Sequence, residues 1–592
     1  MGAIALLQSR VGSPDPAIVR RMLAAAPHRG DQQSVEVLGN VAAGVCNDPT
    51  WVTATIARSE GLLVAFCGAL DNDADLRAEL NRQDAPEPAG ATPAYTVLTV
   101  LDRWGDAAIP RLRGSFAVAV TDGRSTRCFR DQFGARPLFY FDGPTGYYAA
   151  TEIKQVLAGA EISREPDLDY LHGVLYGGIE RNTAYRGVER IPKWTIATAG
   201  SAPGLAWREY WDPSTKVETS NLGFDDAIEG TREALDRAVR RTLTGRDAIL
   251  LSGGLDAPSL AVFAAGAPSL TNPVQAVTAI YPDHPSADES EWTQMVADHV
   301  GMPLHRYVAD AGTLDDVERW VTILDGPVDI VSIPESAESY SVARRLGARM
   351  VMNGEIAEML FESRGYLLDH LLSHGRLTAA IDLMSRWRKQ GTRPRRIARE
   401  VVRALGPPGL VSAYMRRKPR PFRGLPAWVD STNFVHRPPT SRRSARQRWA
   451  WMQTVPFVGP GIGFEADEIC AAVCGVDGRR PFADVDLWEF VLSLRAEVKF
   501  PNGRTKPLLR ETVRGLLPDE IIDRKDKTFF DEFHLAKADY PALRRLLVHP
   551  RHRLHGIDYD QLRSRLEREE MPIFELQWAR NVAKVHAFLN QW

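Results

Sequence analysis

The residues with the clearest chemical potential form a glycine turn directly after an apolar run. Asp247–Leu251 is followed by Ser252-Gly253-Gly254-Leu255-Asp256, where a helix is expected to begin. Glycines let the backbone approach a ligand closely, and free N–H groups at a helix start favour an anion. Ser252 adds a hydroxyl donor, and Asp256 can bind Mg²⁺ that neutralises phosphate charge. The turn therefore predicts a phosphate site. The alternative is a turn that only connects the strand to the helix.

The elements around this turn alternate between strands and helices. The runs 247–251, 274–280 and 349–352 predict strands, and helical stretches lie between them. A helix that precedes the first strand has an apolar face of Ala227, Leu235, Ala238 and Val239. This alternation predicts a parallel α/β sheet.

Residues 1–160 have a different pattern, with many short strands separated by turns. Apolar or aromatic runs at 62–66, 115–120 and 138–141 predict strands, and 73–82 and 91–104 fit helices. We expect an α+β domain built on antiparallel sheets. The change of pattern places the domain boundary near residue 214, between domains 1–214 and 215–592.

Composition excludes several classes of protein for the whole chain of 592 residues. Apolar residues make up 44% and charged residues 25%, which is typical of globular domains and not of a disordered chain. The net charge of −2 is close to zero, so the overall charge gives no sign of a polyanionic partner. Five cysteines are too few for a disulfide framework, and the first residues predict a strand instead of a signal peptide. We therefore expect a cytoplasmic protein without a membrane span.

The segment 386–448 is strongly basic. It holds eighteen Lys and Arg against two acids. One interpretation is a solvated helical surface, and the other is a docking face for an acidic peptide, protein or polyphosphate. Nucleic-acid binding is a minor alternative, because the glycine turn already indicates a different function.

The hexad at 251–256 resembles the pyrophosphate loop of the N-type ATP pyrophosphatases, and it is not a Walker A loop. Further motifs narrow the resemblance to the asparagine synthetase-like family over nearly the whole chain, with 364–450 as its weakest part. These motifs are Arg113–Ala119, Arg130–Tyr140, Ala150–Lys154, Asn353–Phe361, Arg480–Asp484, Thr505-Lys506, Leu509-Arg510, Gly515–Pro518, Arg524 and Lys527.

The resemblance implies a fold for each half of the chain. Residues 1–214 correspond to an Ntn-type, class II glutamine amidotransferase-like domain. Residues 215–592 correspond to a synthetase domain of the adenine nucleotide alpha hydrolase-like type, with helical insertions and a basic insertion at about 364–450.

Two departures from the family pattern argue that the first domain is inactive. Family members that hydrolyse glutamine have a cysteine nucleophile at position 2, where this chain has Gly2. Their Asn-Gly-Glu motif appears here as Cys67-Gly68-Ala69, so the oxyanion-supporting Asn and the substrate-binding Glu are also absent. We expect a scaffold or binding domain, with Cys67 as a small buried hydrophobe.

The resemblance also assigns roles in the second domain. Ser252, Gly253 and Gly254 correspond to phosphate-binding residues, and Asp256 and Glu358 to Mg²⁺ ligands, although the family usually has Asp at the second position. The positions that match adenosine contacts are Leu251, Ile280, Asn353 and Gly354. Lys506 and Lys527 match two lysines that contact pyrophosphate and the reacting centre, where a cation stabilises developing negative charge.

Two of these assignments keep alternatives. Lys525 stands two residues before Lys527, so a slip of register would exchange them. Glu355 either orients or deprotonates the attacking amine, or only pairs with a nearby lysine.

Loss of the ammonia supply implies that a carboxylate is joined to a ready-made amine, through adenylation by ATP and then aminolysis. Among family members without glutaminase activity, the chain length and basic insertion favour a lasso peptide cyclase. Such an enzyme joins an Asp or Glu side chain of a core peptide to the peptide's N-terminal amine as an isopeptide (macrolactam) bond and releases AMP and pyrophosphate. The alternatives are a β-lactam or carbapenam synthetase, a glutamine-independent asparagine synthetase-like ligase, and an inactive scaffold.

A cyclase would work with ATP, Mg²⁺, a precursor peptide, a leader-recognition protein and a leader peptidase. The basic segment is a candidate docking face for one of these partners, through Arg395, Arg396, Arg416 and Arg417. No nucleic-acid partner is expected.

Overall fold

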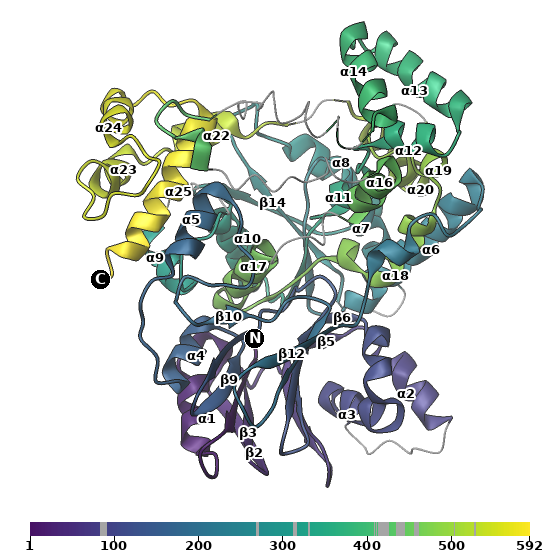
Figure 1. Ribbon diagram of the computed structural model, residues 1–592. Coiled ribbons are helices and arrows are strands. Elements are labelled where there is room, and N and C mark those ends of the chain that lie inside the picture. The colour runs from purple at the N-terminus through teal and green to yellow at the C-terminus, as the bar shows by residue number, and fades with distance from the viewer. Residues whose placement is uncertain are drawn as a thin grey trace.

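The computed structural model describes residues 1–592 apart from 83–90, 268–271, 312–316, 330–331, 408, 410, 412–424, 434–443, 455–460, 502–503 and 526–527. Two antiparallel sheets form the N-terminal part and one parallel sheet forms the centre of the C-terminal part (Figure 1). The predicted classes of sheet, antiparallel and then parallel, are both confirmed.

The N-terminal part consists of two six-stranded antiparallel sheets that share a buried apolar layer. The first sheet has the order β10 (Glu189–Arg190), β8 (Phe139–Gly143), β9 (Gly146–Ala150), β1 (Ala3–Ser9), β3 (Val41–Asn47), β2 (Gln32–Leu38). The second has the order β12 (Leu205–Glu209), β11 (Thr195–Ala199), β7 (Thr126–Arg130), β6 (Gly114–Thr121), β5 (Leu63–Leu70), β4 (Ala54–Arg58). Side chains from both sheets, such as Leu6 and Ala65, meet in one buried cluster.

Helices predicted between these strands are present with nearly the predicted bounds. They are α2 (Asp73–Asn81) and α3 (Pro93–Trp104). Their apolar faces bury Leu76, Leu80 and Val97 against β5 and β6, in one cluster with Phe66 and Phe116.

The C-terminal part is organised by a five-stranded parallel sheet. Its order is β15 (Leu304–Val308), β14 (Gln275–Ile280), β13 (Asp247–Leu250), β16 (Met350–Met352), β17 (Asp477–Arg479). The strand that precedes the glycine turn, β13, is therefore central, with β14 and β16 as parallel neighbours. Parallel strands all end at the same edge of a sheet, so the segments that follow β13, β14 and β16 gather there.

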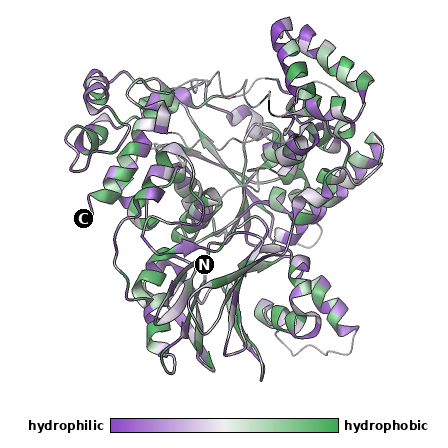
Figure 2. Cartoon of the chain, in the orientation of Figure 1, coloured by the Kyte–Doolittle hydropathy of each residue, from purple (hydrophilic) through white to green (hydrophobic). Residues whose placement is uncertain are grey.

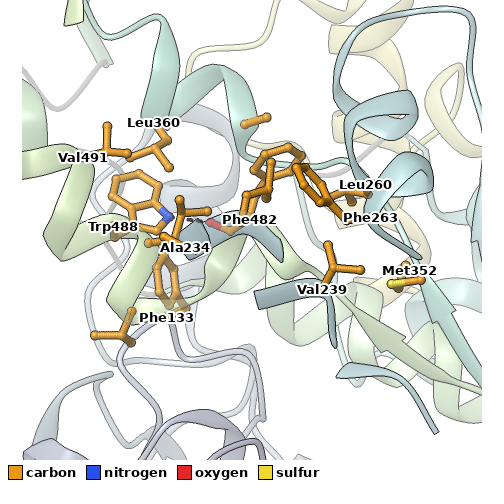
Figure 3. Close-up of a cluster of buried hydrophobic side chains, with 14 of the residues drawn as sticks. Phe133, Ala234, Val239, Leu260, Phe263, Met352, Leu360, Phe482, Trp488 and Val491 are labelled. Atoms are coloured by element: carbon orange, nitrogen blue, oxygen red, sulfur yellow. Dashed lines mark hydrogen bonds between the residues drawn. The ribbon is translucent and has the colours of Figure 1, made fainter. Parts of the chain in front are cut away.

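One large apolar cluster joins the two parts. Trp488 of α18 (Val485–Ser493) is fully buried, and its indole N–H donates to the carbonyl of Phe482 at 2.5 Å. Phe133, from the N-terminal part, packs edge-to-face on Trp488 with ring centroids 5.6 Å apart (Figure 3). The buried face of α6 (Phe224–Thr242), with the predicted Leu235 and Val239, belongs to the same cluster.

Helices of the basic insertion lie away from the sheets, at the upper right of Figure 1. They include α12 (Leu367–Ser373), α13 (Leu377–Lys389), α14 (Pro394–Leu405) and α16 (Ala445–Thr454). Figure 2 shows mixed hydrophilic and hydrophobic residues along α13 and α14. Trp449 of α16 is buried and stacks on His370 of α12, which fixes these helices to one another.

None of the helices in the described ranges has the length and apolar character needed to span a membrane.

Candidate active site

The predicted phosphate turn connects the central strand β13 to α7 (Asp256–Ala265) at the carboxyl edge of the parallel sheet. The N–H of Leu251 donates to the carbonyl of Val277 in β14 at 2.9 Å, which extends the pairing up to the turn. A pocket of about 170 Å³ opens here, and its walls include Leu251, Ser252, Tyr281 and Phe530. The pocket is a candidate adenosine site next to a candidate phosphate site.

Two glycines of the motifs allow close backbone approach. A Cβ atom on Gly354 would lie 2.8 Å from the backbone nitrogen of Ala257 and 3.1 Å from Cβ of Asp256. The 353–354 turn after β16 therefore packs directly on the start of α7, which only glycine permits. At Gly254 a Cβ would meet only the Ser252 hydroxyl, at 3.6 Å, so this part of the turn faces open space.

Lys506 and Asp256 are brought together across 250 residues of sequence. The Lys506 ammonium donates to both oxygens of Asp256, at 2.8 and 2.6 Å. Burial raises the pKa of Asp256, and Lys506 opposes that shift. Lys506 is held in turn by its backbone N–H, which donates to the Glu362 carboxylate at 2.6 Å.

Glu358 of α11 (Ala357–Phe361) lies close enough to Asp256 for its charge to contribute to the raised pKa of that carboxyl. Two carboxylates beside a phosphate turn are the oxygen ligands that Mg²⁺ prefers. The residues present therefore fit a Mg²⁺ ion held by Asp256, Glu358 and phosphate oxygens. Within the described ranges, no group of three or more His, Cys, Asp or Glu forms a metal site by itself.

Glu355 pairs with an arginine and not with a lysine. Its carboxylate accepts from Nε of Arg480 at 2.5 Å, while the side chain remains 51% exposed. Arg480 is itself buried and also pairs with Asp467. Glu355 is thus held by Arg480 and still accessible from solvent.

Two residues of the site have left-handed backbone conformations. Ile356 has φ of +64° and Lys506 has φ of +47°. This conformation is unusual for any side chain and especially for a β-branched one, and such strain clusters at functional sites.

The remaining predicted residues have mixed outcomes. Asn353 is buried, and its side-chain oxygen accepts from the N–H of Glu355 at 3.2 Å, so it shapes the motif. Ile280 is half-buried at the end of β14, where its neighbours Ala279 and Tyr281 line the pocket. Lys527 lies outside the described residues.

Glu289 and Arg524 lie beside the phosphate turn, although sequence reasoning gave neither a role in the site. The carboxylate of Glu289 accepts from the N–H of Gly253 at 2.9 Å, and Arg524 donates to the carbonyl of Gly253 at 2.6 Å. Glu289 directly precedes α8 (Ser290–Val300), and an acidic residue at a helix start usually has a simple electrostatic explanation, so its type and position alone do not indicate a role in the site.

The position of a glutaminase nucleophile is closed. A Cβ atom on Gly2 would lie 2.6 Å from Cβ of Ala54, 2.6 Å from the Asn47 side-chain oxygen and 2.8 Å from the Cys46 carbonyl. Cys67 is fully buried, and burial raises the pKa of its thiol to about 11. Its thiol donates to the carbonyl of Gly2 at 3.3 Å, as a packed residue and not a nucleophile.

Buried ion pairs connect the two parts of the chain next to this closed site. Arg29 and Arg136 both donate to the carboxylate of Glu468, on α17 (Ile462–Val473), at 2.5 to 2.7 Å. Arg136 also pairs with Asp477 of β17 at 2.5 Å. Arg29 is therefore engaged in the domain interface and is not available to a small-molecule substrate. We refer to Arg29, Arg136, Glu468 and Asp477 as the interface network.

Comparisons with known proteins agree with this arrangement. A family model described as "Asparagine synthase" matches residues 230–592, and one described as "Glutamine amidotransferase domain" matches residues 2–211. Asparagine synthetase [glutamine-hydrolyzing] 3 of Bacillus subtilis (strain 168) is 24% identical over 495 residues, covering 80% of this chain and 76% of the relative.

Two further relatives match this chain over different lengths. A putative asparagine synthetase [glutamine-hydrolyzing] of Mycobacterium tuberculosis (strain ATCC 25618 / H37Rv) is 25% identical over 506 residues, covering 78% of this chain and 74% of the relative. Carboxyethyl-arginine beta-lactam-synthase of Streptomyces clavuligerus is 28% identical over 183 residues, covering 30% of this chain and 34% of the relative. The chain belongs to the asparagine synthase family, as an ATP-dependent carbon–nitrogen ligase with a glutamine amidotransferase-like N-terminal domain.

Proposed function

We propose that this protein is a glutamine-independent, ATP-dependent ligase that closes a macrolactam ring in a peptide, as lasso peptide cyclases do. The observation that carries the proposal is the contrast between the two sites. The position of the glutaminase nucleophile has no space for a side chain, whereas Asp256, Lys506 and the phosphate turn are assembled. Ammonia from glutamine is therefore replaced by an amine that the substrate itself brings.

The residues of the site would have separate roles in the adenylation step. The turn at 252–254 binds the phosphates of ATP, and the side chain of Leu251 lies in the wall of the adenosine pocket. Mg²⁺ held by Asp256 and Glu358 would neutralise phosphate charge. The ammonium of Lys506, beside Asp256, stabilises charge that develops as the substrate carboxylate attacks the α-phosphate.

Glu355 would act on the amine in the second half-reaction. Its free carboxylate oxygen can accept a proton from the ammonium form of the peptide N-terminus while Arg480 holds the other end of the side chain. Ring closure is intramolecular because the amine and the adenylated carboxylate belong to the same peptide, so proximity supplies much of the rate.

Exposed apolar side chains beside the site favour a peptide over aspartate. Met359 directly follows Glu358 and is 49% exposed, and Phe529 directly follows Thr528 and is 64% exposed. Apolar groups at the mouth of a site bind the side chains of a peptide better than a small charged metabolite.

The basic tip of the α13–α14 hairpin, defined as Arg388, Lys389, Arg393, Arg395, Arg396 and Arg399, would dock the precursor peptide or a processing partner. All six side chains are exposed, and within the described part of the chain none has an acidic partner. Arg416 and Arg417, also predicted for this role, lie outside the described residues. Leader recognition and leader removal would be supplied by separate proteins.

The proposal is tested by mass spectrometry of a reaction that contains the protein, Mg²⁺, ATP and a core peptide encoded beside its gene. We expect the peptide to lose one water, about 18 Da, with formation of AMP and resistance to carboxypeptidase. Reversing the charge of Arg395 and Arg396 should weaken peptide processing and leave Mg·ATP binding unchanged. The same change at Arg58, a distant exposed arginine, should alter neither peptide processing nor Mg·ATP binding. Unchanged processing in the first variant would contradict the docking role.

A second candidate is a β-lactam-type synthetase that acts on a small β-amino acid. It is supported by the similarity to carboxyethyl-arginine beta-lactam-synthase. Turnover of such a substrate, with no change in the mass of the peptide, would select this alternative.

A further inference from the structure

A carboxylate from a neighbouring loop is bound to the phosphate turn. Glu289 precedes α8 (Ser290–Val300), and its Oε2 accepts from the N–H of Gly253 at 2.9 Å. Its Oε1 accepts from Arg524 Nη1 at 2.9 Å and from the Thr528 hydroxyl at 2.7 Å. One side chain thus joins the turn to a segment that is more than 200 residues away in sequence.

Arg524 is held at this position from several directions. Its Nη1 also donates to the carbonyl of Gly253 at 2.6 Å, and its Nη2 donates to the Thr528 hydroxyl at 2.7 Å. The guanidinium lies over the ring of Trp292, 4.7 Å from the centroid. Its Nε is buried and has no hydrogen-bond partner among the residues that the structure describes. A fixed guanidinium beside a phosphate turn, on a side chain that keeps 12% of its surface exposed, is suited to bind a phosphate oxygen.

Packing around Gly253 accounts for the glycine at this position. A Cβ atom there would lie 2.6 Å from Cβ of Trp292, 2.8 Å from Nη1 of Arg524 and 3.2 Å from Cβ of Glu289. The second residue of the Ser-Gly-Gly turn therefore makes room for Arg524 as well as for a ligand.

The two segments also touch through residues that line the candidate adenosine pocket, Tyr281 and Phe530. Tyr281 packs against Phe530 and Phe533, with ring centroids 5.5 and 4.9 Å apart, and Ser286 hydrogen-bonds Glu532. The contact at Glu289 is thus one of several between 281–292 and 524–533, and it is the one that reaches the phosphate turn.

We propose that Glu289 is a positioning residue that holds Arg524 beside the phosphate turn, where Arg524 binds the pyrophosphate released on adenylation. Glu289 neutralises and orients the guanidinium before ATP binds. The stacking on Trp292 and the bond to the Gly253 carbonyl keep Arg524 in place when phosphate oxygens approach. Adenylation releases pyrophosphate for any carboxylate substrate, so the inference does not depend on a peptide being the substrate.

The test is calorimetric titration of Mg²⁺ and inorganic pyrophosphate into the full-length protein and its variants. We expect E289A to weaken pyrophosphate binding about tenfold or more, because a misplaced arginine loses its charge-assisted hydrogen bonds to phosphate. E289D should recover part of the affinity. The matched control is E291A, two residues away on α8 and exposed, which should bind as the wild type does.

A double-mutant cycle separates positioning from general damage. If Glu289 acts through Arg524, E289A should cause no further loss of pyrophosphate affinity in a protein that already carries R524A. Hydrogen exchange of 528–533 should be faster in E289A, while exchange of β13 should be unchanged. Unchanged or tighter pyrophosphate binding in E289A would overturn the proposal. So would a fold loss of affinity in the double variant that equals the product of the losses in E289A and R524A. If the protein fails to process peptides but the pyrophosphate titrations give the expected results, only the proposed cyclase function is contradicted.

Discussion

Replacing Glu468 by glutamine should destabilise the domain interface more than any surface charge change. The side chain is 2% exposed, and its two oxygens accept three hydrogen bonds from Arg29 and Arg136, which are both 0% exposed. Removing one partner from a buried ion pair typically costs about 3–5 kcal/mol. Since Arg29 keeps Glu152 and Arg136 keeps Asp477, we expect the lower end, about 3 kcal/mol.

This loss can be measured as a shift in thermal unfolding. The N-terminal match spans 2–211, and for a unit of this size 1 kcal/mol corresponds to about 2–4 °C in Tm. E468Q should therefore lower the Tm of the first calorimetric transition by about 6–12 °C. The control is E36Q, because Glu36 pairs at 3.4 Å with Arg58 and both side chains are more than 40% exposed. Such a pair contributes about 0–1 kcal/mol, so E36Q should leave Tm nearly unchanged.

The same network predicts the response to acid. Burial would raise the pKa of Glu468, but pairing with Arg29 and Arg136 outweighs it, and the net pKa is lowered from 4.5. A carboxylate with a depressed folded-state pKa contributes stability that is present above its unfolded pKa and is lost as pH falls through the folded value. The interface should thus weaken below about pH 4.5 in the wild type, and this part of the pH dependence should be absent in E468Q. If the Tm of E468Q lies within 2 °C of the wild-type value, the reasoning about the interface network is refuted.

Three other predictions concern the two sites. K506M should lower the rate of ATP–pyrophosphate exchange by about 10²–10³-fold, with a change in Mg·ATP affinity of only a few fold, because the proposed role of Lys506 is to stabilise charge that develops during the reaction. G354A should weaken Mg·ATP binding at least tenfold in calorimetry, since its Cβ would lie 2.8 Å from the Ala257 nitrogen, whereas G200A, with no atom within 4 Å, should bind normally. G2C should release no glutamate from glutamine, because the new side chain has no space and Arg29 is engaged by Glu468 and Glu152; glutaminase activity in G2C would show that the site is still competent.

The strands and the turn between β13 and α7 could be predicted because their signals are local. The apolar run before Ser252, the spacing of Leu235 and Val239 on α6, and the short strands at 62–66 and 115–120 all depend on neighbouring residues only. The prediction that Cys67 is a buried hydrophobe is confirmed for the same reason: it continues the apolar pattern of β5.

The charged contacts could not be predicted, because they join residues that are distant in sequence. Arg29 and Glu468 are 439 residues apart, and Lys506 and Asp256 are 250 residues apart. Charged residues are usually exposed, so nothing local indicates that Arg29, Arg136 or Glu468 is buried. Glu355 was predicted either to act on the amine or to pair with a lysine; the observed partner, Arg480, comes from a motif that sequence reasoning had used only for the resemblance.

The interface network gives a physical reason for keeping the glutamine amidotransferase-like domain, in which a side chain at position 2 has no space. β17 contacts the N-terminal part on one side, through Arg136–Asp477 and through Asp71, which accepts from Arg479 at 2.6 Å. On its other side the carbonyl of Arg479 accepts from the N–H of Asn353 at 3.1 Å, and the next residue, Arg480, holds Glu355. Loss of the N-terminal domain would remove the partners of Arg479 and Asp477 and expose this side of β17, directly beside the motif that carries Glu355 and Glu358. The domain thus contributes to the geometry of the synthetase site, and this contribution persists whether or not glutamine is ever hydrolysed.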